Sequence, residues 1–171
     1  MGYTIAICDD DKNMADKLTV SLKNEFMKAG RNDVIIDYYD TGVQLLEALK
    51  NKMYKAVLLD INMEPMDGFS VAEAIGKSGY RTKIIFVTSH EDVVYDTFDY
   101  TPFYFIRKSR YETYVQRVVK KLIAIDGYEK TIVLDDKDGI ININSGDITY
   151  VQSEDHYPVS YTHLTLPTTS L

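Results

Sequence analysis

The chain has 171 residues, 45% of them hydrophobic and 26% charged, and a formal net charge of −7 at pH 7. This length suits one domain with a smaller remainder and excludes two full-sized domains. The acidic balance argues against nucleic-acid binding, and the single cysteine excludes an internal disulfide bond. Because no apolar run approaches the roughly 20 residues of a membrane span and the first residues lack a signal-peptide pattern, we expect a cytoplasmic globular protein without membrane contact.

Residues 1–124 alternate between two patterns. Short apolar runs rich in β-branched residues predict strands over residues 3–8, 33–38, 55–59, 83–88 and 103–106. Apolar positions at helical spacing predict a helix after each strand: from Asp11 or Asn13 to Gly30, from Asp40 or Thr41 through Leu49, and over residues 66–77, 90–98 and 111–125.

Five strands that alternate with five helices predict an α/β fold with a parallel sheet covered on both faces and right-handed crossovers. About 120 residues fit the flavodoxin-like (βα)5 fold, with strand order 2-1-3-4-5, better than a larger dinucleotide fold. The first strand is followed by acidic residues and not by a glycine-rich phosphate loop, which excludes the dinucleotide-binding alternative.

The composition changes near residue 125, where we expect a domain boundary. Residues 1–124 carry 17 basic and 18 acidic side chains, whereas residues 125–171 carry 2 basic and 8 acidic ones. Within residues 125–157, short runs at 131–134, 139–143 and 147–151 predict a β-meander. Residues 158–171 have no charged side chain and no helical periodicity, so we expect a tail that is disordered or foreign to the natural protein.

Polar residues stand at the carboxyl ends of four predicted strands. Asp9 and Asp10 follow the first strand, and Asp60 follows the third. Thr88 is the last residue of the fourth strand, and Lys108 follows the fifth. Ligands of open parallel sheets bind beyond the carboxyl ends of the strands, where the strand order reverses. The first and third strands are neighbours at that point, so we expect the three carboxylates to converge on one pocket.

These residue types together suit phosphoryl chemistry. Three carboxylates in one pocket repel each other unless a divalent cation is present, and oxygen ligands without Cys or His favour Mg²⁺ over zinc. One carboxylate then remains free to act as a nucleophile toward a phosphoryl group, with Thr88 and Lys108 to hold its oxygens. Taken alone, each aspartate is most simply a cap or turn residue and Lys108 a surface charge; only their combination indicates a site.

The pattern over residues 3–124 resembles the receiver domain of two-component response regulators. Two departures concern the loops: Glu64, before Pro65, stands where the family commonly has proline, and Ser109 follows Lys108 where a cis proline is usual. The resemblance implies a metal-binding pair at Asp9 and Asp10 completed by Asp60 and the backbone carbonyl of Asn62, a phosphoacceptor at Asp60, a switch hydroxyl at Thr88, an invariant-type lysine at Lys108 and a switch aromatic at Phe105.

A second stretch, GDITYVQSEDHYPVSY at residues 146–161, resembles the first strands of a LytTR-type DNA-binding domain. The stretch PFYFIRKS at residues 102–109 also resembles receivers of that subfamily. We therefore expect residues 125–157 to be the N-terminal fragment of such a domain. Because this segment lacks a basic face, we expect DNA binding in a full-length parent and not in this chain.

The resemblance implies that a sensor histidine kinase phosphorylates Asp60 with Mg²⁺ bound, and that the phosphorylated form dimerises and controls the output domain. The expected chemistry is self-catalysed phosphoryl transfer and autodephosphorylation, not enzymatic turnover. Two alternatives stay open: a phosphorylation-independent interaction module, and a haloacid-dehalogenase-like phosphatase, which would need a second acid where Asn62 stands. Cys8, at the end of an apolar strand, is expected to be a buried hydrophobic residue and not a redox sensor.

Overall fold

The structure, a computed structural model, describes residues 3–89, 100, 102–128, 131–136, 139–144, 148–154 and 157–162, with side-chain surroundings up to residue 126. The chain divides into two compact units, Met1–Lys120 and Lys121–Leu171. Each unit is considered by itself. None of the helices in these described parts is both long and apolar enough to cross a membrane.

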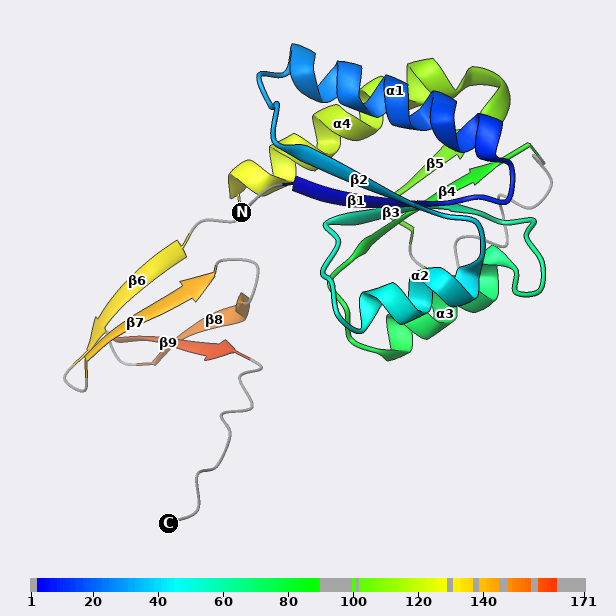
Figure 1. The fold of residues 1–171 in the computed structure, drawn as a ribbon. Helices are drawn as coiled ribbons and strands as arrows, with labels where there is room; N and C mark the ends of the chain where they lie inside the picture. The colour runs from blue at the N-terminus through cyan, green and yellow to red at the C-terminus, as the bar shows by residue number, and fades with distance from the viewer. Residues whose placement is uncertain are drawn as a thin grey trace. The chain divides into compact units, whose positions relative to one another are not determined.

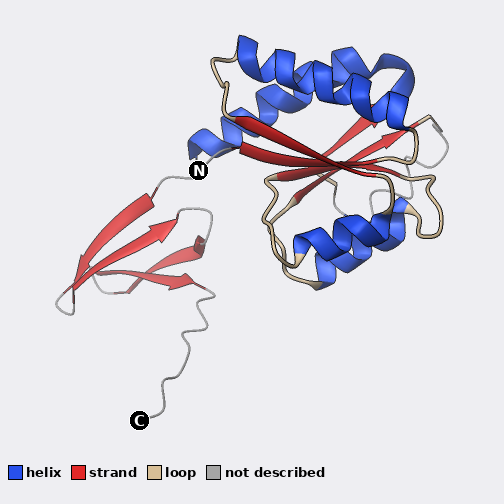
Figure 2. Ribbon diagram, viewed as in Figure 1, coloured by secondary structure: helices blue, strands red, loops and turns tan. Residues whose placement is uncertain are grey.

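The first unit is built on a five-stranded parallel sheet with the order β2-β1-β3-β4-β5. This confirms the predicted flavodoxin-like topology. Figure 1 shows α1 and α4 on one face of the sheet and α2 and α3 on the other, and Figure 2 shows the sheet between these helical layers. The strands are β1 (Tyr3–Cys8), β2 (Val34–Tyr39), β3 (Ala56–Asp60), β4 (Lys83–Thr88) and β5 (Tyr104–Arg107).

The first three helices begin where side chains cap their free amides. Asp11 and Thr41, each one of two alternatives in the sequence, cap the first two helices, and Asp67 caps the third. That last cap makes the third helix begin two residues later than predicted. The helix predicted over residues 90–98 lies outside the described residues. The helices are α1 (Lys12–Lys28), α2 (Gly42–Leu49), α3 (Gly68–Lys77) and α4 (Tyr111–Tyr128).

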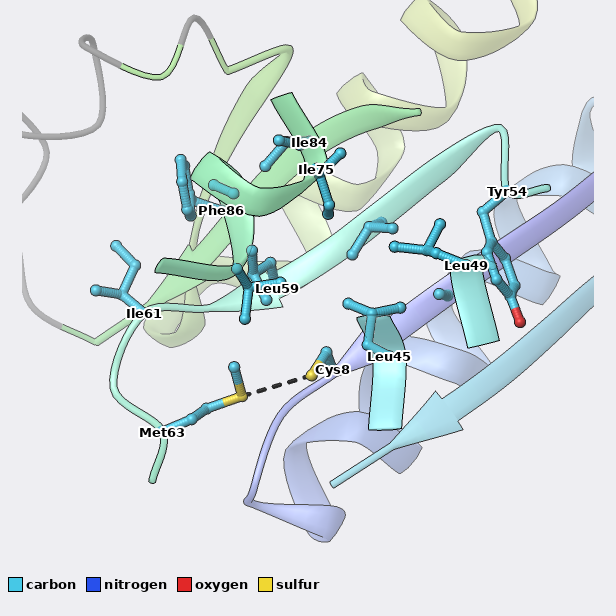
Figure 3. Close-up of a cluster of buried hydrophobic side chains, with 14 residues drawn as sticks. Cys8, Leu45, Leu49, Tyr54, Leu59, Ile61, Met63, Ile75, Ile84 and Phe86 are labelled. Atoms are coloured by element: carbon cyan, nitrogen blue, oxygen red, sulfur yellow. Dashed lines mark hydrogen bonds between the residues drawn. The ribbon is translucent and has the colours of Figure 1, made fainter. Parts of the chain in front are cut away.

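The apolar core lies on both faces of the sheet, because β1 and β3 are buried almost throughout. Figure 3 shows the cluster on the side of α2 and α3, where side chains of the strands pack against Leu45 and Ile75. Cys8 is fully buried in this cluster, as predicted, with its thiol 3.7 Å from the Met63 sulfur. Burial, followed by the nearby Asp9 charge, raises the pKa of the Cys8 thiol to about 12, so the thiol is protonated and unreactive at neutral pH.

The second unit contains two antiparallel strand pairs and not the predicted meander. β6 (Thr131–Asp136) pairs with β7 (Gly139–Asn144), and β8 (Ile148–Glu154) pairs with β9 (Tyr157–Thr162). The tail that was expected to be disordered or foreign to the natural protein begins within a strand, because residues 158–162 belong to β9. Alternating Tyr and Val side chains in this stretch favour a strand, and its proline is tolerated because the sheet has only two strands. Residues 163–171 lie outside the described residues.

Candidate functional site

Three carboxylates meet at the carboxyl end of the sheet, as the strand order predicts. Asp9 directly follows β1 and is fully buried, and Asp60 is the last residue of the neighbouring strand β3 and 4% exposed. Asp10 is exposed at the mouth of the pocket. One carboxylate oxygen from each of the three residues lies within 4.8 Å of the others. We call these three residues the acidic pocket.

Lys108 reaches into the acidic pocket from the end of β5. Its ammonium group donates hydrogen bonds of 2.9 Å to Asp60 Oδ2 and 3.1 Å to Asp9 Oδ1. The side chain of Lys108 is only 15% exposed, so this ion pair is largely shielded from water. Among the described residues the cis peptide bond is the one before Pro65, and the Lys108–Ser109 bond is trans. The lysine therefore makes both contacts without the family's cis proline.

The remaining carboxylate oxygens differ in how they are satisfied. Asp60 Oδ1 accepts the amide of Ile61 at 2.8 Å, and Asp9 Oδ1 accepts the amide of Asp11 at 2.9 Å. Asp9 Oδ2 lies 2.9 Å from the Lys108 nitrogen but without hydrogen-bond geometry, and it has no hydrogen-bond partner. This oxygen is thus ion-paired with Lys108 but accepts no hydrogen bond, and carboxylate oxygens are ligands that suit a hard cation. The donor set of the acidic pocket thus fits Mg²⁺.

The electrostatics of the acidic pocket are unbalanced. Burial raises the pKa of both Asp9 and Asp60, and the hydrogen bonds from Lys108 only partly oppose this effect. Burial acts to lower the pKa of Lys108, but the bonds to Asp60 and Asp9 outweigh it and the pKa is raised. One ammonium thus faces two buried carboxylates and a third at the rim, which leaves an excess of negative charge.

The other three predicted site residues lie around the acidic pocket. Thr88 is the buried last residue of β4, one position beyond Val87, which pairs with Asp60. Asn62 is exposed in the loop two residues after Asp60. Phe105 is half-buried on β5 and packs against the apolar cluster shown in Figure 3, not in the pocket. The structure therefore brings Lys108 and the carboxylates into contact and places Thr88 at the adjoining strand end.

Two further residues also shape the acidic pocket. The hydroxyl of Tyr38 donates a 3.1 Å hydrogen bond to the backbone carbonyl oxygen of Asp9. Gly68 packs against the backbone of Asp60, where a Cβ atom would collide with the carbonyl oxygen, and its amide donates to the Ile61 carbonyl at 2.9 Å. The Asp67-Gly68 pair was a sequence signal for the second contact, whereas nothing in the sequence pointed to the first.

The family model of the response regulator receiver domain matches residues 5–120, and the chain belongs to this family. Domains of this family are signalling modules and not turnover enzymes. The first unit is therefore the receiver domain of a response regulator.

Two curated relatives match the chain over similar lengths. The transcriptional regulatory protein YpdB of Escherichia coli (strain K12) is 28% identical over 90 residues, which are 53% of this chain and 37% of YpdB. The protein MrkE of Klebsiella pneumoniae is 27% identical over 88 residues, which are 52% of this chain and 33% of MrkE. The chain thus spans about a third of the length of these relatives.

Solved structures show the same fold. The crystal structure of the response regulatory domain of MrkE superposes with a TM-score of 0.63 at 22% identity and covers 71% of this chain and 96% of that domain. The response regulator TrrA from Thermotoga maritima, in complex with Mg²⁺–BeF, gives a TM-score of 0.58 at 29% identity and covers 71% of this chain and 99% of TrrA.

Proposed function

We propose that this chain accepts a phosphoryl group on Asp60 from the phosphohistidine of a sensor histidine kinase, and that this modification switches the receiver domain to control a DNA-binding output domain. The observation that carries the proposal is the geometry of the acidic pocket. Lys108 bonds to both Asp9 and Asp60, yet Asp9 Oδ2 has no hydrogen-bond partner. The pocket therefore has unused capacity for positive charge next to a buried nucleophile.

The residues that would hold Mg²⁺ are Asp9, Asp10, Asp60 and the backbone carbonyl of Asn62. Three of these offer carboxylate oxygens within 4.8 Å of one another, which is compact enough for a single ion. Bound Mg²⁺ supplies charge neutralisation for the oxygens of the incoming phosphoryl group. The metal-bound TrrA relative supports this assignment.

The transfer itself needs an oxygen nucleophile, positioning and charge neutralisation. A carboxylate oxygen of Asp60 attacks phosphorus, the phosphorus–nitrogen bond to the kinase histidine breaks, and the imidazole nitrogen keeps the electron pair and takes up a proton. The Lys108 ammonium, 2.9 Å from Asp60 Oδ2 before transfer, then pairs with a phosphoryl oxygen. In autodephosphorylation a water oxygen attacks phosphorus, the bond from phosphorus to the Asp60 oxygen breaks, and inorganic phosphate leaves. The domain therefore acts as a switch and not as a turnover enzyme.

The switch uses contacts that exist only in the phosphorylated state, because only such contacts shift a population. The Thr88 hydroxyl at the neighbouring strand end binds a second phosphoryl oxygen, and Phe105 moves inward and repacks the surface around β5. The repacked surface forms a homodimer. Phe105 is half-buried in the structure, so it has exposed surface to lose in such a movement.

The output that we propose is transcription regulation through a LytTR-type DNA-binding domain, of which residues 125–157 form the first part. The similarity of this chain to YpdB, a transcriptional regulatory protein, supports this output. The strand-rich character of the second unit agrees with the resemblance of residues 146–161 to that domain. Only the full-length parent is proposed to bind DNA.

Phosphorylation by acetyl phosphate tests the proposal. With Mg²⁺ present, we expect the wild-type chain to gain one phosphoryl group, measured by mass spectrometry. With EDTA in the reaction, we expect no labelling. Asp60→Asn should abolish the labelling, while Asp33→Asn, a control at an exposed position just before β2, should not change it. Labelling that persists in Asp60→Asn contradicts the assignment of the phosphoacceptor. An unlabelled wild type would favour the phosphorylation-independent interaction module.

A further inference from the structure

Tyr38 on β2 contacts the backbone of the acidic pocket, although it stands at none of the strand ends that supply the carboxylates. Its hydroxyl donates the 3.1 Å hydrogen bond to the Asp9 carbonyl oxygen. That carbonyl belongs to the planar peptide group that joins Asp9 to Asp10. The Tyr38 hydroxyl therefore fixes the peptide plane between two of the three pocket carboxylates.

The register between β1 and β2 places Tyr38 within reach of this carbonyl. Tyr38 lies opposite Ile7 in the parallel pairing, and the pairing continues past β1, where the Asp9 amide donates to the Tyr39 carbonyl at 3.2 Å. The backbone of Asp9 is thus held at its amide by the main chain of β2 and at its carbonyl by a β2 side chain. Both anchors come from one strand.

The ring of Tyr38 is itself held in place. The side chain is half-buried, and the Lys12 ammonium at the start of α1 lies 4.8 Å from the ring centroid. A cation at this distance is attracted to the ring face. Lys12 also forms an ion pair of 3.2 Å with Asp16, which keeps its ammonium on this side of the helix. The Lys12 contact therefore favours the ring position from which the hydroxyl reaches the Asp9 carbonyl.

The three carboxylates differ in how much they need such support. Asp9 and Asp60 are buried and bonded to Lys108 and to nearby amides. Asp10 is exposed, so the position of its carboxylate depends on the backbone that precedes it. The peptide plane that Tyr38 holds is that backbone.

We propose that Tyr38 is a positioning residue of the magnesium site, because its hydroxyl orients the Asp9–Asp10 peptide and thereby directs the Asp10 carboxylate toward the bound ion. The inference rests on the proposed function of the acidic pocket. Groups that orient metal ligands without touching the metal commonly change metal affinity when they are removed. Tyr38 acts in this way through a main-chain atom, with no contact to the ion itself.

Isothermal titration with Mg²⁺ tests the inference on the full chain. Tyr38→Phe removes only the hydroxyl, and Tyr39→Phe is a matched control in the same strand, because the Tyr39 hydroxyl bonds to the Tyr54 hydroxyl and not to the pocket. We expect Tyr38→Phe to weaken Mg²⁺ binding about tenfold and Tyr39→Phe to change it less than about twofold. Hydrogen exchange by NMR should show faster exchange at the Asp10 and Asp11 amides in Tyr38→Phe alone.

The outcomes separate the inference from the proposed function. Equal Mg²⁺ affinities of Tyr38→Phe and Tyr39→Phe would overturn the positioning role and leave the magnesium site intact. A wild-type chain that binds no Mg²⁺ would overturn both. If Tyr38→Phe lowers the unfolding temperature without Mg²⁺, the rise in that temperature on adding Mg²⁺ is compared among the chains. A rise equal to that of the wild type would assign Tyr38 a purely structural role.

Discussion

Two polar clusters of the receiver domain each bring a lysine to aspartate side chains but differ in charge balance. The acidic pocket combines two buried carboxylates with one ammonium, and one of its oxygens has no hydrogen-bond partner. The second cluster, which we call the Asp37 cluster, consists of Asp37, Tyr39, Lys52 and Tyr54. There a single carboxylate oxygen accepts both the Lys52 ammonium and, at 2.6 Å, the Tyr54 hydroxyl, and Tyr54 in turn bonds to Tyr39.

The pKa values of the carboxylates reflect this difference. Burial acts to raise the pKa of Asp37, but the bonds from Lys52 and Tyr54 outweigh it, and the pKa is lowered. Burial also raises the pKa of Asp9 and Asp60, but here the opposing effect of the lysine is shared between two carboxylates, and the pKa of each stays raised. A satisfied cluster of this kind supports the fold, whereas an undersupplied one costs stability and is kept where function needs it.

Replacing the lysine of each cluster should give the largest difference in the free energy of unfolding. Lys108→Met leaves two buried carboxylates without a cation, so we expect the free energy of unfolding at pH 7 to fall by about 3 kcal/mol. Lys52→Met, in the Asp37 cluster, should cost at most about 1 kcal/mol, because Lys52 is 43% exposed. Urea unfolding without Mg²⁺ measures both values. Equal losses would mean that the acidic pocket carries no excess of negative charge.

A methyl group beside the acidic pocket should have the next largest effect. In Gly68→Ala the new Cβ collides with the Asp60 backbone carbonyl, so we expect a loss of about 2 kcal/mol and slower labelling by acetyl phosphate. Gly76→Ala is the control in the same helix, because nothing lies within 4 Å of its Cβ position. It should leave stability unchanged or raise it by about 1 kcal/mol. Normal labelling of Gly68→Ala would show that the Asp60 backbone can shift without damage to the site.

The sequence alone was sufficient to predict the acidic pocket. Parallel strands end at one edge of a sheet, so the strand pattern and the strand order bring Asp9, Asp10 and Asp60 together without knowledge of side-chain contacts. Lys108 followed from the same argument. The carboxyl-end rule works here because it depends on topology, and the topology follows from the alternation of strands and helices.

Contacts that depend on register were not predictable in this way. Tyr38 reaches Asp9 because β2 pairs with β1 in one particular register, which an apolar strand pattern does not specify. In the second unit the β6–β7 pair agrees with the predicted meander, but the partner of β8 was mispredicted, because short β-prone runs indicate strands but not their partners. Because β9 was not predicted, the pairing of β8 with β9 was not predicted either.

The smallest expected effect is the most direct test of the comparison, because it concerns the sign of a change. The folded pKa of Asp60 lies above the ordinary aspartate value of 3.8, so its ionised form destabilises the fold at neutral pH, and this cost vanishes as the pH falls below 3.8. The folded pKa of Asp37 lies below 3.8, so its ionised form stabilises the fold above that pH, and this contribution is lost as the pH falls through the folded pKa.

Replacing each aspartate by asparagine should therefore change the free energy of unfolding in opposite directions. At pH 7 without Mg²⁺, Asp60→Asn should raise the free energy of unfolding by about 1 kcal/mol, because it removes a buried charge that shares its lysine. Asp37→Asn should lower it by about 1 kcal/mol, because it weakens two hydrogen bonds to a charged acceptor. Urea unfolding from pH 7 to pH 3 should show both variants approaching the wild-type free energy of unfolding, Asp60→Asn from above and Asp37→Asn from below. If both variants are destabilised at pH 7, Lys108 satisfies both of its carboxylates, and the acidic pocket is as balanced as the Asp37 cluster.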